Sequence, residues 1–129
     1  MTDLLTIYRE YLQCLNERRW DELGQFVTDD VVHNGARLGL SGYRMMLERD
    51  TEAIPDLQFV PAILVADDSM VSCRLFFECT PRQTFLGFEP TGQRMSFAEH
   101  VFYRFASGRI AEVWSLIDTD AIRAQHSAH

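Results

Sequence analysis

The chain has 129 residues, of which 47% are hydrophobic, so we expect a single domain over residues 1–129 with a well-buried core. Its formal net charge of -7 and its lack of any run of Lys or Arg disfavour nucleic acid and anionic membrane surfaces as partners. Three cysteines without CxxC spacing are typical of a reduced protein, and the N-terminus does not resemble a signal peptide. We therefore expect a cytoplasmic protein with no membrane span.

The first part of the chain has the spacing of amphipathic helices, with apolar residues every three or four positions. It predicts a helix from the cap at Thr2 or Asp3 to Asn16, a short second helix over residues 20–27, and a third from Ser41. The third helix cannot pass Pro55. Between the last two helices, residues 31–33 predict a brief strand that ends at an Asn-Gly turn.

Beyond Pro55 the apolar spacing changes to the alternation of strands. Strands are predicted over residues 57–66 and 70–80, and over the two arms of a last hairpin from Met95 to Asp118. A short helix around residues 121–125 follows. Helices first and antiparallel strands after them predict an α+β fold, in which a curved antiparallel sheet wraps around three N-terminal helices. Such a cone has an open end where a pocket can form.

The connection between the two hairpins is rich in turn residues, yet it carries Phe85, Leu86 and Phe88. Exposed loops usually avoid such side chains, so we expect this segment to fold over another part of the protein.

The last hairpin carries three ionisable residues on apolar strands: Glu99, His100 and Asp118. Alternation places Glu99 and His100 on opposite faces, so both cannot line one pocket. Asp118 shares its face with Trp114, and burial beside the indole would raise the pKa of the carboxyl toward the range of a general base. Alternatively, Asp118 caps the helix that follows it.

Other residues are weaker candidates for the same pocket. His33 and Asn34 stand at a strand end beside a turn, where active-site groups are common. Arg74 could bind an acidic group or lie on a solvated strand face, and Asp50 could be a second pocket carboxylate or the end of a helical stripe. Tyr43 and Phe102 are expected to join Trp114 in lining the walls. No glycine-rich phosphate loop, nucleophile elbow or metal-ligand spacing occurs, so we expect neither cofactor nor metal.

Three stretches of the chain resemble the SnoaL-like polyketide cyclases and the ester-cyclase group around them, within the nuclear transport factor 2-like superfamily. They are FLGFEPTG at residues 85–92, the YRF-x-x-GRI turn from Tyr103 to Ile110, and Glu112-Val113-Trp114 followed by Asp118 and Gln125. One departure is Cys79-Thr80-Pro81, where many relatives have Gly-Thr-His.

The resemblance implies a cone-shaped fold and a reaction without metal or organic cofactor. An aspartate on the last strand of family cyclases removes an α-proton next to a carbonyl, and the enolate closes a ring by intramolecular aldol addition. Asp118 matches that aspartate, which favours catalysis over capping. His100 or His33 would orient it or stabilise the enolate oxygen, and the substrate would be a small hydrophobic molecule with a carbonyl.

Two alternatives remain open at this point. An epoxide hydrolase of the same fold would need an Asp/Arg/Asp set, for which only Asp50, Arg74 and Asp118 qualify. A non-catalytic module would use the pocket to bind a hydrophobic ligand. In either case the aromatic content of the open sheet face predicts a homodimer.

Overall fold

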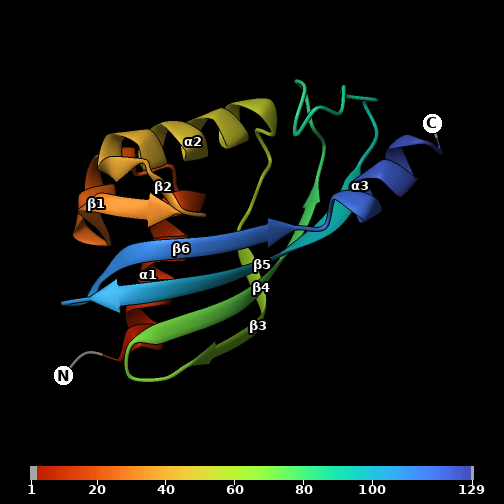
Figure 1. The fold of residues 1–129 in the computed structure, drawn as a ribbon. Coiled ribbons are helices and arrows are strands. Elements are labelled where there is room, and N and C mark those ends of the chain that lie inside the picture. The colour runs from red at the N-terminus through yellow and green to blue at the C-terminus, as the bar shows by residue number, and fades with distance from the viewer. Residues whose placement is uncertain (1–2, 129) are drawn as a thin grey trace.

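The computed structural model describes residues 3–128 and shows a six-stranded curved sheet with helices on one of its faces (Figure 1). This confirms the predicted α+β class. The elements in chain order are α1 (Leu4–Asn16), the 3-10 helix η1 (Trp20–Gln25), β1 (Val27–His33), β2 (Ala36–Arg37), α2 (Gly39–Ala53), β3 (Val60–Ala66), β4 (Met70–Cys79), β5 (Met95–Ala106), β6 (Arg109–Ile117) and α3 (Thr119–His126).

The sheet has the strand order β2-β1-β6-β5-β4-β3, and one of its pairs is parallel. β1 runs parallel to β6, where Ile110 N donates to Phe26 O (2.7 Å) and Asn34 N donates to Val113 O (2.8 Å). The expected all-antiparallel sheet is wrong for this pair. The two strands are far apart in sequence, so no tight turn forces them to run in opposite directions.

β5 is one of the two middle strands and pairs over most of its length with both β4 and β6. On the concave face, α1 lies against the sheet and α2 lies beside β1 (Figure 1). Alternate residues of β4 are buried there, as the sequence alternation predicts: Val71, Cys73, Leu75, Phe77 and Cys79. Neither α1 nor α2 covers the opposite face of β3 to β6, and α3 contacts the start of β5, where Gln125 bonds to Ser96.

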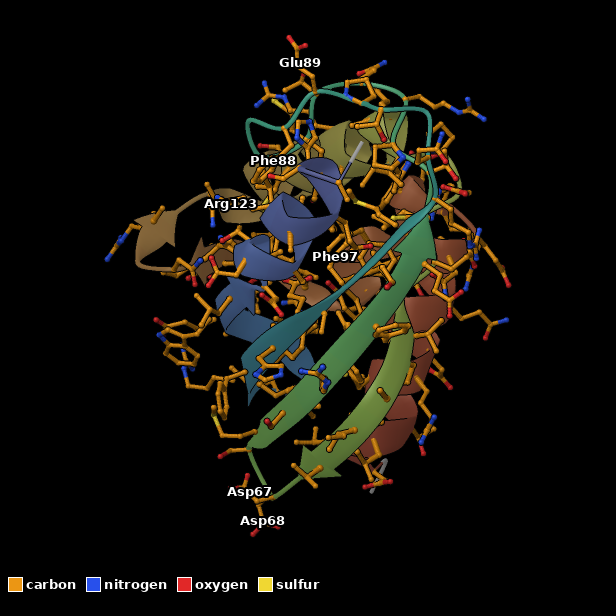
Figure 2. All side chains as sticks on the ribbon, turned by 90° about the vertical axis from the view of Figure 1, so that its right-hand side faces the viewer. Asp67, Asp68, Phe88, Glu89, Phe97 and Arg123 are labelled. Atoms are coloured by element: carbon orange, nitrogen blue, oxygen red, sulfur yellow. The ribbon has the colours of Figure 1, made fainter. Side chains whose placement is uncertain are left out.

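The segment between β4 and β5 folds over the end of the sheet, as predicted from its apolar residues. Phe85 and Phe88 exchange two backbone hydrogen bonds of 2.9 Å, and the Phe85 ring packs 5.8 Å from that of Phe97. Figure 2 shows Phe88 beside Arg123 of α3, whose guanidinium lies 5.7 Å from the ring centroid. α3 therefore anchors this segment through Phe88.

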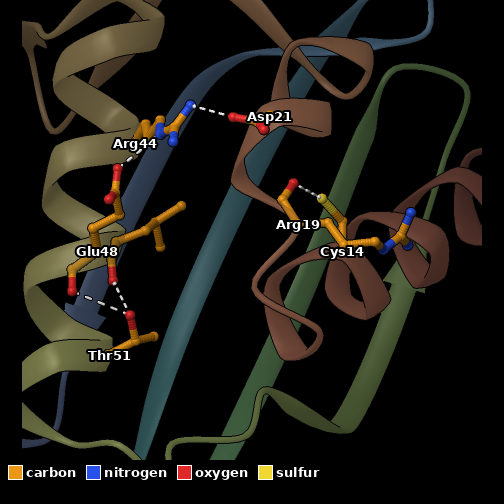
Figure 3. A network of polar contacts seen from close by, with 7 residues as sticks. Cys14, Arg19, Asp21, Arg44, Glu48 and Thr51 are labelled. Carbon is orange, nitrogen blue, oxygen red and sulfur yellow. Dashed lines mark hydrogen bonds and ion pairs between the residues drawn. The ribbon is translucent and has the colours of Figure 1, made fainter.

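A polar network joins η1 to α2 on the other side of the molecule (Figure 3). Arg44 bonds to Asp21 at 3.2 Å and to Glu48 at 2.8 Å, while the Cys14 thiol donates to the carbonyl of Arg19 at 3.1 Å. The ion pairs are solvent-exposed and contribute little stability. The network mainly fixes where η1 lies relative to the two helices.

Three side-chain amides each form two hydrogen bonds with the backbone of a distant residue. Asn16 pairs with Phe59 N and O (2.7 and 3.1 Å), and Gln125 pairs with Ser96 N and O (2.9 and 2.6 Å). The third, Asn34, belongs to the cavity described below. These amides satisfy peptide groups that the sheet leaves unpaired. Asn34 and Gln125 thereby join a turn and a helix to a strand, and Asn16 joins the end of α1 to the residue before β3.

We expect Asn16→Ala to lower the free energy of unfolding by roughly 1–3 kcal/mol, because both partly buried peptide groups of Phe59 lose their partner. Urea denaturation measures the change. Gln13→Ala is the matched control, since this amide of the same helix bonds only to the exposed Glu17 side chain. Equal losses in the two variants would contradict the structural role of Asn16.

Candidate active site

A cavity of about 430 Å³ lies between the two long helices and the concave face of the sheet. α1 contributes Tyr11 to its wall and α2 contributes Tyr43, while inward-facing residues of β4 to β6 form the other side. Leu86, from the segment that folds over the sheet, stands at the rim with 49% of its surface exposed. Apolar side chains make up much of the wall, so any polar group within it is informative.

Glu99 is the carboxyl of the sheet that lies in this cavity. It faces inward because it alternates with the buried Val101 and Tyr103 on β5. The Ser115 hydroxyl, on the neighbouring strand β6, donates a hydrogen bond to Glu99 Oε2. Burial raises the pKa of Glu99 to about 7, against the opposing effect of the bond from Ser115. A carboxyl of this kind can both take and return a proton near neutral pH.

Ser115 is held in place by the side chain of Asn34. Ser115 N donates to Asn34 Oδ1 (2.8 Å) and Asn34 Nδ2 donates to Ser115 O (3.2 Å). Asn34 has a left-handed backbone (φ 48°) at the turn that follows β1, which aims its amide at β6. The turn residue thus positions the serine that bonds to Glu99.

Asp50 brings a second carboxyl to the cavity from α2. Burial raises the pKa of Asp50 to about 6, and its charge in turn raises the pKa of Glu99. Over residues 3–128 neither carboxyl forms an ion pair with an arginine or histidine. The two acids therefore share an environment that favours their protonated forms.

His33 also lines the cavity, with its ring edge-on to that of Tyr43 at a centroid distance of 6.2 Å. Burial lowers the pKa of His33, so its neutral imidazole is favoured at neutral pH. Three predicted site residues, His33, Asn34 and Tyr43, thus lie together in this cavity.

Phe102 and Trp114 lie on the other side of the sheet. They face each other across β5 and β6 on the outer surface, where 52% and 39% of their areas are exposed. The expectation that these two aromatics line the cavity is wrong. Alternation had correctly grouped Trp114 with Asp118, but the helices cover the opposite face, the one that carries Glu99 and Ser115.

Arg74, His100 and Asp118 are brought together in a separate depression of about 370 Å³ on the outer side. Arg74 Nη1 lies 2.5 Å from His100 Nε2, and the Asp118 carboxylate accepts a hydrogen bond from Ala121 N (3.1 Å). Asp118 is the N-cap of α3, so the capping interpretation is confirmed. Because Asp50 lies in the cavity, the set Asp50, Arg74 and Asp118 is not assembled.

The sequence does not single out Ser115 as a site residue, and the shared face with Trp114 favours Asp118 over Glu99. A signal for Glu99 was present, since it is the charged member of the otherwise apolar series Phe97, Val101, Tyr103 and Phe105. Ser115 stands between Val113 and Ile117 and offers no comparable signal. Its role depends on the register between β5 and β6, which places it opposite Val101 and beside Glu99.

No three His, Cys, Asp or Glu side chains within residues 3–128 gather in a way that could hold a metal ion. No helix in the same range is both long enough and apolar enough to cross a membrane.

Comparison with known proteins agrees with this architecture. The family model described as SnoaL-like polyketide cyclase matches residues 5–126. The crystal structure of a SnoaL-like polyketide cyclase from Agrobacterium tumefaciens is 50% identical, with a TM-score of 0.94 over 97% of this chain and 98% of that one. A search of curated proteins found no match.

More distant structures share the fold. TsrD from Streptomyces laurentii is 22% identical with a TM-score of 0.87 over 100% of both chains. AclR from Streptomyces galilaeus is 23% identical with a TM-score of 0.81 over 98% of this chain and 96% of that one. With a family match over nearly its whole length and a relative at 50% identity, the chain belongs to the SnoaL-like polyketide cyclase family.

Proposed function

We propose that this protein is an enzyme that transfers a proton next to a carbonyl of a small hydrophobic molecule, with Glu99 as the proton carrier. The observation that supports this most directly is a carboxyl inside an apolar-walled cavity, hydrogen-bonded by Ser115 and paired with no cation of the described chain. The family match supports the same class of reaction.

In this mechanism the Glu99 carboxylate removes a proton from the carbon next to the carbonyl, and the electron pair moves onto the carbonyl oxygen. Ser115 occupies Oε2 and leaves Oε1 free for the substrate. The enolate then attacks a second carbonyl of the same molecule, as in a cyclase, or is protonated at another carbon, as in an isomerase. Asp50 faces the same cavity and can carry a second proton.

The proposed substrate class follows from the composition of the cavity wall. No arginine of the described chain lines the cavity, which disfavours a strongly acidic substrate. Side chains such as Phe59, Leu75 and Val101 offer apolar contact instead. A cavity of about 430 Å³ is in the range of small-molecule sites. A small polyketide-like ketone fits these properties.

We expect Glu99→Gln to slow exchange of the α-protons of 2-tetralone by about 100-fold or more, because the amide cannot accept the proton. The reaction is followed by proton NMR in deuterium oxide. Asp118→Asn is the matched control and should exchange within about threefold of the wild type, since Asp118 lies outside the cavity.

The opposite result, with loss only in Asp118→Asn, would overturn the assignment of Glu99 and support Asp118 as the acid/base. If wild type, both variants and buffer exchange at the same rate, the chain does not catalyse this reaction on a simple ketone. A module that only binds a hydrophobic ligand would then be the better interpretation.

We expect the free energy of unfolding to fall as the pH rises from about 4.5 to about 7, by on the order of 1–3 kcal/mol. The pKa of Glu99 is raised in the folded protein, so between these values the native state binds more protons than the unfolded state. Urea denaturation at each pH measures this slope. In Glu99→Gln only the part due to Asp50 should remain, whereas the exposed Glu10→Gln should behave as the wild type.

We also propose that the protein forms a homodimer through the bare face of β3 to β6. Seven of the nine large hydrophobic side chains that are exposed in the described chain lie on this face: Val60, Ile63, Val65, Phe76, Phe102, Trp114 and Leu116. Four strands give a face of roughly 600 Å², close to the roughly 800 Å² per partner of a typical stable interface.

The charged side chains on this face are balanced in sign, which allows the same face of a second copy to approach. Arg104 and Glu112 pair at 3.6 Å, and Arg74 lies nearby, so the face is not acidic although the whole chain has a net charge of -7. Two such faces can approach without the repulsion that the rest of the surface would impose.

The dimer predicts that Phe102→Glu yields a monomer, because each interface would bury two unpaired charges. Light scattering after size-exclusion chromatography gives the mass. Met45→Glu is the control, since Met45 is similarly exposed (51%) but lies on α2, away from this face. A monomeric wild type would contradict the proposal.

A further inference from the structure

Two buried tyrosines form a hydrogen-bonded pair in the cavity wall. Tyr11 of α1 and Tyr43 of α2 have their hydroxyl oxygens 2.7 Å apart, and only 1% and 2% of their areas are exposed. Both line the cavity that holds Glu99. The mechanism described so far uses neither hydroxyl.

The pair has one hydrogen to spare. Each phenol carries one hydrogen, and only one is needed for the bond between the two oxygens. The other has no acceptor among residues 3–128. The third tyrosine of the cavity, Tyr103, belongs to a separate pair: it accepts a bond from Tyr8 (3.2 Å), which is not part of the cavity wall, and keeps a hydrogen of its own. A buried donor without a partner costs free energy unless a ligand accepts from it.

The two tyrosines are not equivalent. Burial raises the pKa of both, and either hydroxyl can donate to the other. Their surroundings differ, because the Tyr11 ring packs against Tyr8 and Phe26 outside the cavity wall, whereas the Tyr43 ring packs against His33 within it. We therefore assign Tyr11 as the donor within the pair. Tyr43 then keeps the free hydrogen and is the better hydrogen-bond donor to a ligand.

The proposed reaction needs such a donor. Removing an α-proton places negative charge on the carbonyl oxygen, and this charge is costly in an apolar cavity. The chain contains no lysine, so no lysine side chain can convert the carbonyl to an iminium, and no arginine of the described chain lines the cavity. A phenolic hydroxyl is a suitable neutral group for this position.

We infer that Tyr43, oriented by Tyr11, donates a hydrogen bond to the carbonyl oxygen of the ligand and stabilises the enolate oxygen that forms when Glu99 takes the proton. This inference rests on the proposed function of the cavity. In the step itself the C–H bond breaks, the Glu99 O–H bond forms, and the electron pair moves to the oxygen that Tyr43 contacts. Tyr43 is then a catalytic residue and Tyr11 a positioning residue.

The test uses 2-tetralone with a ¹³C-labelled carbonyl bound to the full-length protein, with infrared difference spectroscopy of the C=O stretch. In the wild type the stretch should lie below its frequency in hexane, as expected for a hydrogen-bonded carbonyl. Tyr43→Phe should move it back toward the hexane value and weaken binding about tenfold, which corresponds to the loss of one hydrogen bond. Tyr8→Phe removes a buried hydroxyl outside the cavity and should leave both quantities unchanged.

Two further variants separate the inference from the proposed function. Glu99→Gln should keep the lowered C=O frequency while losing α-proton exchange, so failure at Glu99 and failure at Tyr43 give different results. Tyr11→Phe should retain part of the shift, because Tyr43 keeps its hydroxyl but loses its orienting partner. The inference is overturned if Tyr43→Phe keeps both the shift and the affinity, if the wild type shows no shift, or if Tyr11→Phe alone abolishes it.

Discussion

The double pairing of β5 is the constraint on which the site depends. Hydrogen bonds to β4 on one side and to β6 on the other fix its register along almost its whole length. Since side chains alternate along a strand, this register sends Glu99 into the cavity and His100 to the outer surface. A slip by one residue would exchange the two and also separate Glu99 from Ser115. The polar chemistry of the cavity thus follows from a backbone interaction.

The packing of the helices determines which face of the sheet becomes the wall of the cavity. α1 and α2 cover the face of the sheet that carries Glu99, and they bring Tyr11, Tyr43 and Asp50 to the same space. Apolar side chains make up much of its wall, and several polar groups there are perturbed or held by a partner. The carboxyls are pushed toward their protonated forms, Ser115 is held by Asn34, and the two tyrosines bond to each other. Burial of polar groups makes the fold less stable than an apolar core would, and it makes proton transfer possible.

The outer face shows why strand alternation alone identified the wrong pocket wall. Trp114 and Asp118 do share a face, but an aromatic side chain beside a carboxylate is equally compatible with a buried pocket and an exposed surface. The choice between these depends on where the helices pack, and that contact joins residues distant in sequence. Asp118 illustrates the ambiguity further, since one position can satisfy both a strand pattern and the N-cap of α3.

By itself the sequence determined most of the helices and strands, though not β2 or the first half of β1, and it determined the turn at Asn34, the apolar segment that folds over the sheet, and the grouping of residues into two faces of each strand. These depend on local spacing, capping and turn chemistry, which lie within a few residues of one another. Only the tertiary structure decided which face is covered, the parallel pairing of β1 with β6, and the meeting of Glu99, Ser115, Asn34 and the tyrosine pair in one cavity. Their groups come from five elements or turns of the chain, and no local pattern encodes a contact that packing alone creates.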